Sequence, residues 1–154
     1  MSESSLTETA DQVEIRRPLL LALTAAAVMV LGSLLPWLTV TTSLGSFSFT
    51  GTEGDGSITM ALGAGIALMA AVGLIQKRAT FVSGTLIALA GVVAGMEALN
   101  FVNDAKTTLG LVDGTEIDVV SRPGMWVSML GCAVVVVAGV YLLIAVRRER
   151  RAAE

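Results

Sequence analysis

The chain has 154 residues with a formal net charge of −3, and 54% of them are hydrophobic while 15% are charged. Soluble domains carry about 25% charged residues, so this composition excludes an ordinary soluble domain, and at this length we expect one domain. The sequence holds no histidine and one cysteine, Cys132, which excludes an intrachain disulfide and a cysteine-based zinc site.

Residues 1–17 are polar and mostly acidic, and they end in Arg16 and Arg17. Their lack of a hydrophobic period predicts a disordered tail. The following apolar run predicts a helix over residues 18–38, which is about the length that crosses a hydrocarbon layer of about 30 Å. A cleaved signal peptide is the competing interpretation, and we disfavour it because the run is long and no A-x-A-like site follows. Trp37 is expected at the lipid–water interface.

Two more apolar runs predict helices over residues 58–75 and 80–102, and the short basic turn between them makes these helices antiparallel neighbours. Gly91 and Gly95 form a GxxxG motif in the third helix, beside a stripe of alanines. Small residues let helices approach closely in lipid, so we expect this helix at the centre of the packing. We assign the motif to contacts within the chain, with a homodimer face as the alternative.

Two polar gaps separate the predicted helices. The first alternates like a strand through Phe47 and Phe49, and the second has strand-like residues on both sides of Asp113-Gly114. We expect these segments to form a small β element beyond the membrane, with irregular loops as the alternative. Phe47 and Phe49 are apolar side chains there that need a partner, either the second gap or another protein.

The fourth apolar run predicts a helix over residues 124–146, with Trp126 at the interface, and a basic tail over residues 148–154 follows it. The membrane domain therefore covers residues 18–147. With four spans, both termini share one side, and that side collects most of the basic residues: Arg16, Arg17, Lys77, Arg78, Arg147, Arg148, Arg150 and Arg151. Lys106 and Arg122 fall on the other side, so the positive-inside rule predicts cytoplasmic termini.

Glu97 is the acidic residue that lies inside an apolar run. An ionisable residue at membrane depth suggests function, such as a proton or cation pathway. We favour an interfacial carboxylate that reaches water or pairs with Lys106 or Arg122, because Glu97 falls near the outer end of its helix. The other acidic residues match no calcium-loop spacing, and no catalytic or nucleotide-binding motif occurs. We therefore expect no enzyme activity, no metal, no cofactor and no nucleic-acid partner.

Three short motifs carry a resemblance to a known group of proteins. Leu35-Pro36-Trp37 leaves the first helix, Gly54-Asp55-Gly56 enters the second, and Pro123-Gly124-Met125-Trp126 enters the fourth. In these residues the chain resembles small, uncharacterised actinobacterial membrane proteins with four helices. The resemblance implies an all-α bundle of two antiparallel hairpins in a bacterial plasma membrane, and it implies no catalytic residues.

The leading functional hypothesis is a non-enzymatic accessory subunit that packs against a larger membrane complex, with respiratory complexes among the candidates. Its expected contacts are the lipid bilayer and other membrane-protein subunits, and a homo-oligomer stays open. One alternative is a small oligomeric channel or transporter with Glu97 near its mouth. Another alternative is an envelope sensor or immunity protein that is recognised through the first polar gap.

Overall fold

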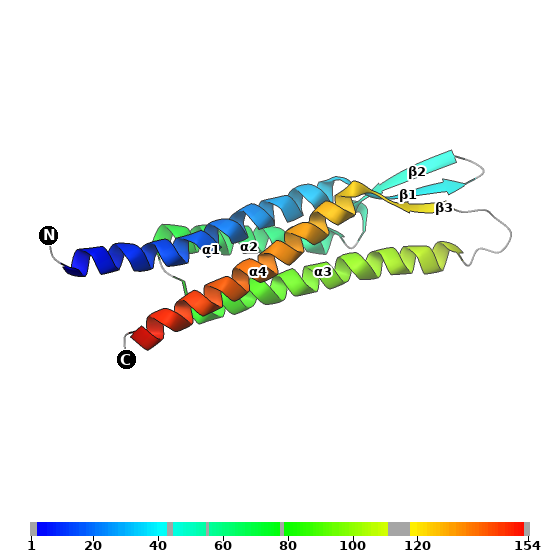
Figure 1. The fold of residues 1–154 in the computed structure, drawn as a ribbon. Coiled ribbons are helices and arrows are strands. Elements are labelled where there is room, and N and C mark those ends of the chain that lie inside the picture. The colour runs from blue at the N-terminus through cyan, green and yellow to red at the C-terminus, as the bar shows by residue number, and fades with distance from the viewer. Residues whose placement is uncertain (1–2, 43–44, 55, 78, 111–117, 153–154) are drawn as a thin grey trace.

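The computed structural model describes residues 3–42, 45–54, 56–77, 79–110 and 118–152, and Figure 1 shows their arrangement. These residues form four long helices, a short 3₁₀ helix and a small sheet. In chain order the elements are α1 (Glu3–Leu34), β1 (Pro36–Thr42), β2 (Gly45–Thr50), η1 (Gly51–Glu53), α2 (Gly56–Gln76), α3 (Phe81–Gly110), β3 (Asp118–Ser121) and α4 (Pro123–Ala152).

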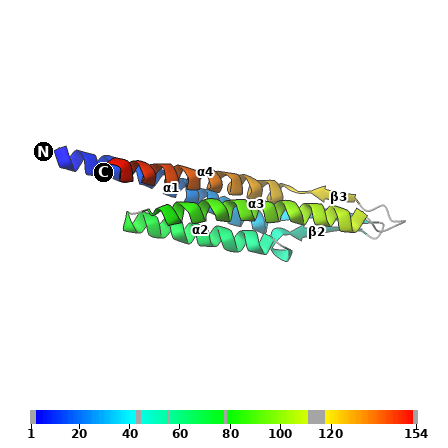
Figure 2. The same cartoon turned by 90° about the horizontal axis from the view of Figure 1, so that it is seen from below.

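Each of the long helices in the described part of the chain holds a stretch that is long and apolar enough to cross a bilayer. The stretches are Ile15–Leu34, Gly56–Gln76, Phe81–Phe101 and Pro123–Arg151. The helices run along one long axis, with both termini at one end and the strands at the other (Figures 1 and 2). We call these ends the termini end and the sheet end. The predicted fold, an all-α membrane bundle with a small β element, is confirmed.

The first helix differs from the prediction at both of its ends. It begins at Glu3, within residues 1–17, for which the sequence predicted a disordered tail. A nucleated helix extends at little cost, and this segment holds good helix formers such as Glu, Leu and Ala. The helix ends at Leu34 rather than at residue 38, because Pro36 disfavours helical geometry at the residue before it.

The other helices also extend beyond their predicted bounds. The helix α2 covers Gly56–Gln76, whereas residues 58–75 were predicted. The helix α4 continues to Ala152 through most of the predicted basic tail 148–154. The largest difference is in α3, which was predicted to end at residue 102 and continues to Gly110. Its last turns are polar and extend beyond the apolar stretch, because helix geometry does not require burial. The hairpin turn predicted at Asp113-Gly114 lies outside the described residues.

The centre of the bundle is the contact between α1 and α4, where small residues let the two backbones approach. A Cβ atom on Gly131 would lie 2.7 Å from the Met29 side chain, and one on Gly32 would lie 2.5 Å from Ser128 Oγ. The Ser128 hydroxyl donates a hydrogen bond to the Met29 carbonyl oxygen across this contact, at 3.3 Å. Such close packing and interhelical hydrogen bonding stabilise helix pairs in lipid.

The remaining helices flank this central pair. Gly63 of α2 lies against Val30 of α1, and Gly139 of α4 lies against Ala88 of α3. The apolar stretches of α1 and α4 are each 44% buried, whereas that of α3 is 28% buried. The expectation that the third helix is the centre of the packing is therefore wrong, because the shortest glycine contact between two spanning helices joins α1 and α4.

The strands form an antiparallel sheet in the order β2-β1-β3 over the described residues. Val40 of the central strand lies opposite Phe47 on one side and Val119 on the other, which confirms strands in both polar gaps. An irregularity between Pro36 and Leu38 shifts the register where the sheet leaves α1. Proline at the first residue of a strand removes no necessary ladder bond. The sheet therefore begins directly at the end of the bundle.

Candidate functional site

Trp37 is fully buried where α1, the sheet and α3 meet. Its indole Nε1 donates a hydrogen bond to the Gly32 carbonyl oxygen at 3.0 Å, and its ring meets the Phe101 ring edge to face at 5.8 Å between centroids. Trp37 has an exposed fraction of 0%, so the prediction that it faces the lipid–water interface is wrong. The indole is buried because the N–H finds a backbone acceptor and the ring finds an aromatic partner.

Two glycines hold the loop before α2 against these rings. A Cβ atom on Gly51 would lie 2.6 Å from the Trp37 ring, and one on Gly54 would overlap the Phe101 ring. The backbone N–H of Gly51 also donates to the Leu35 carbonyl oxygen at 3.3 Å. The tryptophan motif at the end of α1 and the glycine-rich loop before α2 thus form one packed cluster. Asp55 of that loop lies outside the described residues.

These contacts also fix the level at which the bundle ends. Gly54, just before α2, touches Phe101, which ends the apolar stretch of α3. Gly124, in the first turn of α4, lies against Leu35, just after α1. The apolar stretches of α1 and α3 therefore finish, and those of α2 and α4 begin, at the same position along the bundle axis. We call this position the boundary level. The sheet lies beyond it.

Phe47 and Phe49 lie on the edge strand β2 and are exposed by 58% and 43%. They oppose Val40 and Leu38 of β1, which are buried. Over the described residues, the structure leaves this apolar edge without a partner.

Arg122 lies at the boundary level between β3 and α4, on the other face of the sheet from the phenylalanines. Its Nε donates a hydrogen bond to Thr39 Oγ1 at 2.7 Å, and that oxygen lies 3.2 Å from Ser48 Oγ. Its backbone N–H donates to the Trp37 carbonyl oxygen at 2.8 Å. Beside it is a partly open hollow of about 280 Å³, lined by Leu35, Pro36, Ser48, Arg122, Pro123 and Gly124.

From the sequence we assigned Arg122 only to the topology signal and to a pairing with Glu97. The missed signal is a cation directly before the start of an apolar helix, on the side that otherwise lacks basic residues. The hydroxyl partners Thr39 and Ser48 lie 83 and 74 residues away along the chain. Only the strand pairing of Thr39 with Ser48 and Val120 brings them together.

Glu97 is half-buried on α3, one helical turn before Phe101. Among the described side chains Arg122 bonds to Thr39 and not to Glu97, so the pairing that we predicted as one alternative does not form. The side chain of Lys106, the other predicted partner, lies outside the described part. Over the side chains that the structure describes, no group of acidic or cysteine residues could hold a metal ion.

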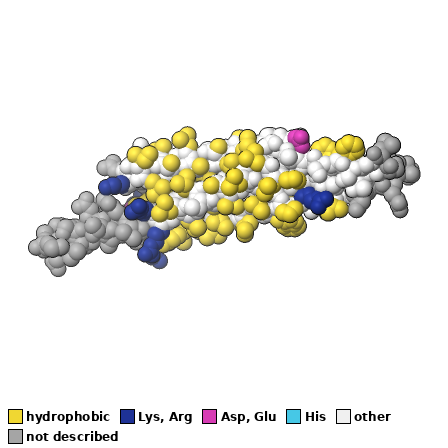
Figure 3. All heavy atoms as spheres, turned by 90° about the horizontal axis from the view of Figure 1, so that it is seen from above, with side chains coloured by type: hydrophobic (Ala, Val, Ile, Leu, Met, Phe, Trp, Pro, Cys, Tyr) yellow, Lys and Arg dark blue, Asp and Glu magenta, His cyan; other side chains and the backbone are white. Residues whose placement is uncertain are grey.

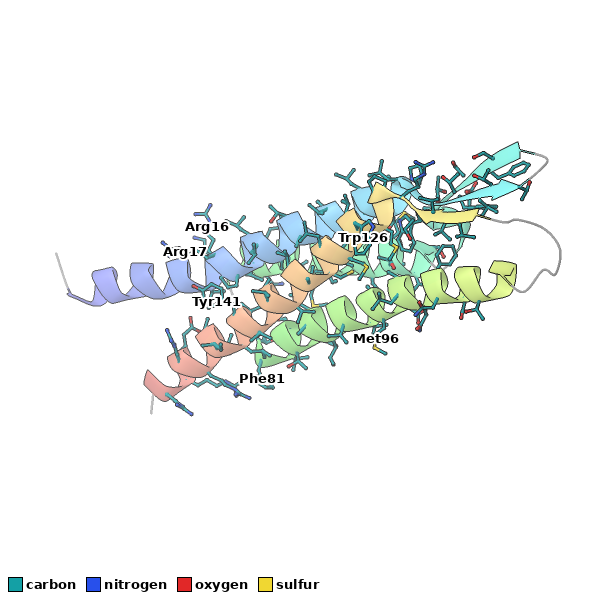
Figure 4. The ribbon with its side chains drawn as sticks, turned by 45° about the vertical axis from the view of Figure 1, so that its right-hand side comes forward. Arg16, Arg17, Phe81, Met96, Trp126 and Tyr141 are labelled. Atoms are coloured by element: carbon teal, nitrogen blue, oxygen red, sulfur yellow. The ribbon has the colours of Figure 1, made fainter. Side chains whose placement is uncertain are left out.

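The glycine motif of α3 faces inward. A Cβ atom on Gly91 would lie 2.9 Å from the Val135 side chain of α4, and one on Gly95 would lie 3.7 Å from the Cys132 side chain. Both glycines therefore serve packing within the chain, as the sequence analysis favoured. Trp126 is 60% exposed in the first turn of α4, near the sheet end of the bundle (Figure 4). Its exposure fits an aromatic anchor at the boundary level.

Comparison with known protein families identifies a family to which this chain is similar. A family described as tryptophan-associated transmembrane protein matches residues 19–154, which is most of the chain. The chain belongs to this family. The match begins at the first apolar residues of α1 and includes the Trp37 cluster, the sheet and all of the spans that the structure describes. No curated protein and no solved structure matches the chain.

Proposed function

We propose that the chain is a non-enzymatic accessory subunit of a larger assembly in a bacterial plasma membrane. In this proposal its sheet is outside the cell, and its exposed phenylalanine edge contacts another membrane protein. The family match supports an integral membrane protein, and the family is described as tryptophan-associated. The packed bundle supports a protein whose own helices form a stable unit, on which a partner can dock.

The orientation in this proposal rests on the distribution of basic side chains. Arg16 and Arg17 lie toward the termini end of the bundle (Figure 4), and other basic side chains gather at that end (Figure 3). Arg147 belongs to the same group, with its guanidinium 5.2 Å from the centre of the Phe81 ring. Positive residues mark the cytoplasmic side of membrane proteins. The termini end is therefore cytoplasmic in this proposal, and the sheet end is outside.

The observation that carries the proposal is the exposed pair Phe47 and Phe49. Two aromatic side chains at alternate positions of one strand present a continuous apolar edge, and aromatic residues are enriched where proteins bind each other. The strand is held in place by pairing with β1, which is itself anchored by the buried Trp37. A rigid, apolar, aromatic edge on the sheet, beyond the apolar stretches of the helices, supports a protein partner.

Gentle solubilisation and identification of the co-purifying membrane proteins test this proposal. The double variant Phe47→Ser, Phe49→Ser is expected to lower recovery of the partner about tenfold or more, because buried aromatic anchors each contribute about 1–2 kcal/mol or more to binding. Val120→Ser is the matched control. Val120 is 43% exposed, like Phe49, but it opposes Thr39 and so lies on the other face of the sheet. We expect this variant to keep the partner.

Two results would contradict the proposal. One is a wild-type protein that purifies as a lone, monodisperse monomer under mild conditions. The other is a double variant that keeps the same partner in the same amount as Val120→Ser does. Because the family is described as tryptophan-associated, the purification is made from cells grown with and without added tryptophan, so that a partner present in only one condition is not missed.

A further inference from the structure

The hollow beside Arg122 has features of an anion site that the proposed function does not use. Its lining combines the Arg122 guanidinium and the Ser48 hydroxyl with the apolar surfaces of Leu35, Pro36 and Pro123. Its volume of about 280 Å³ is enough for a phosphate group with a short polar linker. A mostly apolar hollow with a few polar groups is typical of a small binding site.

The guanidinium is held in one orientation with part of its donors free. The Nε–H is committed to Thr39 Oγ1 at 2.7 Å, which leaves the terminal N–H groups for a ligand. No carboxylate among the described side chains pairs with Arg122, although the side chain is a permanent cation. The planar fork of an arginine matches the oxygens of a phosphate and binds them in a bidentate manner.

The position of the hollow identifies the source of the phosphate. Leu35 and Gly124 lie at the boundary level, where the apolar stretches end and the lipid headgroups begin. Apolar side chains on the membrane side of the hollow suit the glycerol and first acyl carbons of a lipid. No acidic residue among the described side chains lines the hollow to receive an ammonium group, so the lining favours an anionic headgroup over a zwitterionic one.

We propose that the Arg122 hollow binds the phosphate of an anionic phospholipid in the leaflet at the sheet end. Arg122 contacts the phosphate through its terminal nitrogens, and Ser48 offers a further hydroxyl donor. Thr39 is a positioning residue, because it holds the guanidinium in place without lining the hollow. The interaction rests on one specific cation and differs from the general attraction of basic tails to a charged surface.

Native mass spectrometry of the detergent-purified protein, titrated with phosphatidylglycerol or phosphatidylcholine, tests this proposal. We expect preferential retention of phosphatidylglycerol by the wild type, and loss of that preference by about tenfold or more in Arg122→Gln, because a hydrogen bond to a charged group is strong. Arg16→Gln, which removes an exposed cation at the termini end, is the matched control and is expected to change retention less than about twofold.

Two further variants keep the test decisive if Arg122→Gln folds poorly. Arg122→Lys retains the charge but loses the fork, and Thr39→Val retains the whole guanidinium but releases its Nε. Both are expected to weaken retention of phosphatidylglycerol about threefold or more. Equal lipid retention in wild type, Arg122→Lys and Thr39→Val would overturn the proposal. So would inorganic phosphate that binds at Arg122 as tightly as the lipid does, because the site would then take a free anion.

Discussion

Gly131→Val is expected to prevent stable assembly of the bundle. A Cβ atom at Gly131 would lie 2.7 Å from Met29 Cγ, 2.9 Å from the Met29 backbone nitrogen and 3.1 Å from the Ala25 carbonyl oxygen. Two of these neighbours are backbone atoms, so a rotamer change cannot make room and α1 must move away from α4. The separation would also break the hydrogen bond from Ser128 to Met29.

The expected loss for Gly131→Val is about 3 kcal/mol or more in the free energy of unfolding, at the upper end of the range for overpacked cores. Denaturant titration of the detergent-solubilised protein, followed by helix content, measures it. Gly65→Val is the matched control, because a Cβ atom at Gly65 of α2 meets nothing within 4 Å. If both variants unfold at the same denaturant concentration, the α1–α4 contact is not the centre of the structure.

Trp37→Ala is expected to detach the sheet from the bundle and to cost about 3–5 kcal/mol, the usual loss when a buried tryptophan is truncated. The change leaves a cavity between Gly51 and Phe101 and removes the hydrogen bond to the Gly32 carbonyl oxygen. Amide exchange in β1 and β2 should rise by orders of magnitude, while exchange in the middle of α4 should change far less.

Trp126→Ala is the matched control for this truncation. The same residue type is 60% exposed at Trp126 and 0% exposed at Trp37. We expect Trp126→Ala to lower the free energy of unfolding by less than about 1 kcal/mol and to leave exchange in the sheet unchanged. Equal losses for the two tryptophans would show that the Trp37 cluster does not hold the sheet to the bundle.

The spans could be predicted from the sequence because each is an uninterrupted apolar run of membrane-crossing length. Their ends could not, since α3 continues through polar residues to Gly110 and α1 begins at Glu3, where no apolar pattern marks a helix. The packing of Gly91 against another helix of the same chain could be predicted from the small size of glycine alone. The sequence could not predict that α1 and α4 form the central helix pair, because this depends on which residues each glycine meets on a neighbouring helix.

The candidate site was predicted only in part. Alternation along β2 indicated that Phe47 and Phe49 share a face, but their exposure depends on β2 being an edge strand. Trp37 was predicted at the interface because its neighbours in sequence end a span. It is buried because Gly51 and Phe101, which are distant along the chain, close over it. Tertiary contacts of this kind leave no local pattern.

The proposed function requires the sheet to lie outside the cell, and labelling of single cysteines with a membrane-impermeant maleimide tests this most directly. Ser46 of β2 and Gln76 at the end of α2 are both exposed, and the native Cys132 is buried, with an exposed fraction of 3%. We expect Ser46→Cys to be labelled in intact cells and Gln76→Cys only after permeabilisation, with the unmodified chain as the background. The reverse pattern would place the sheet in the cytoplasm and contradict the account.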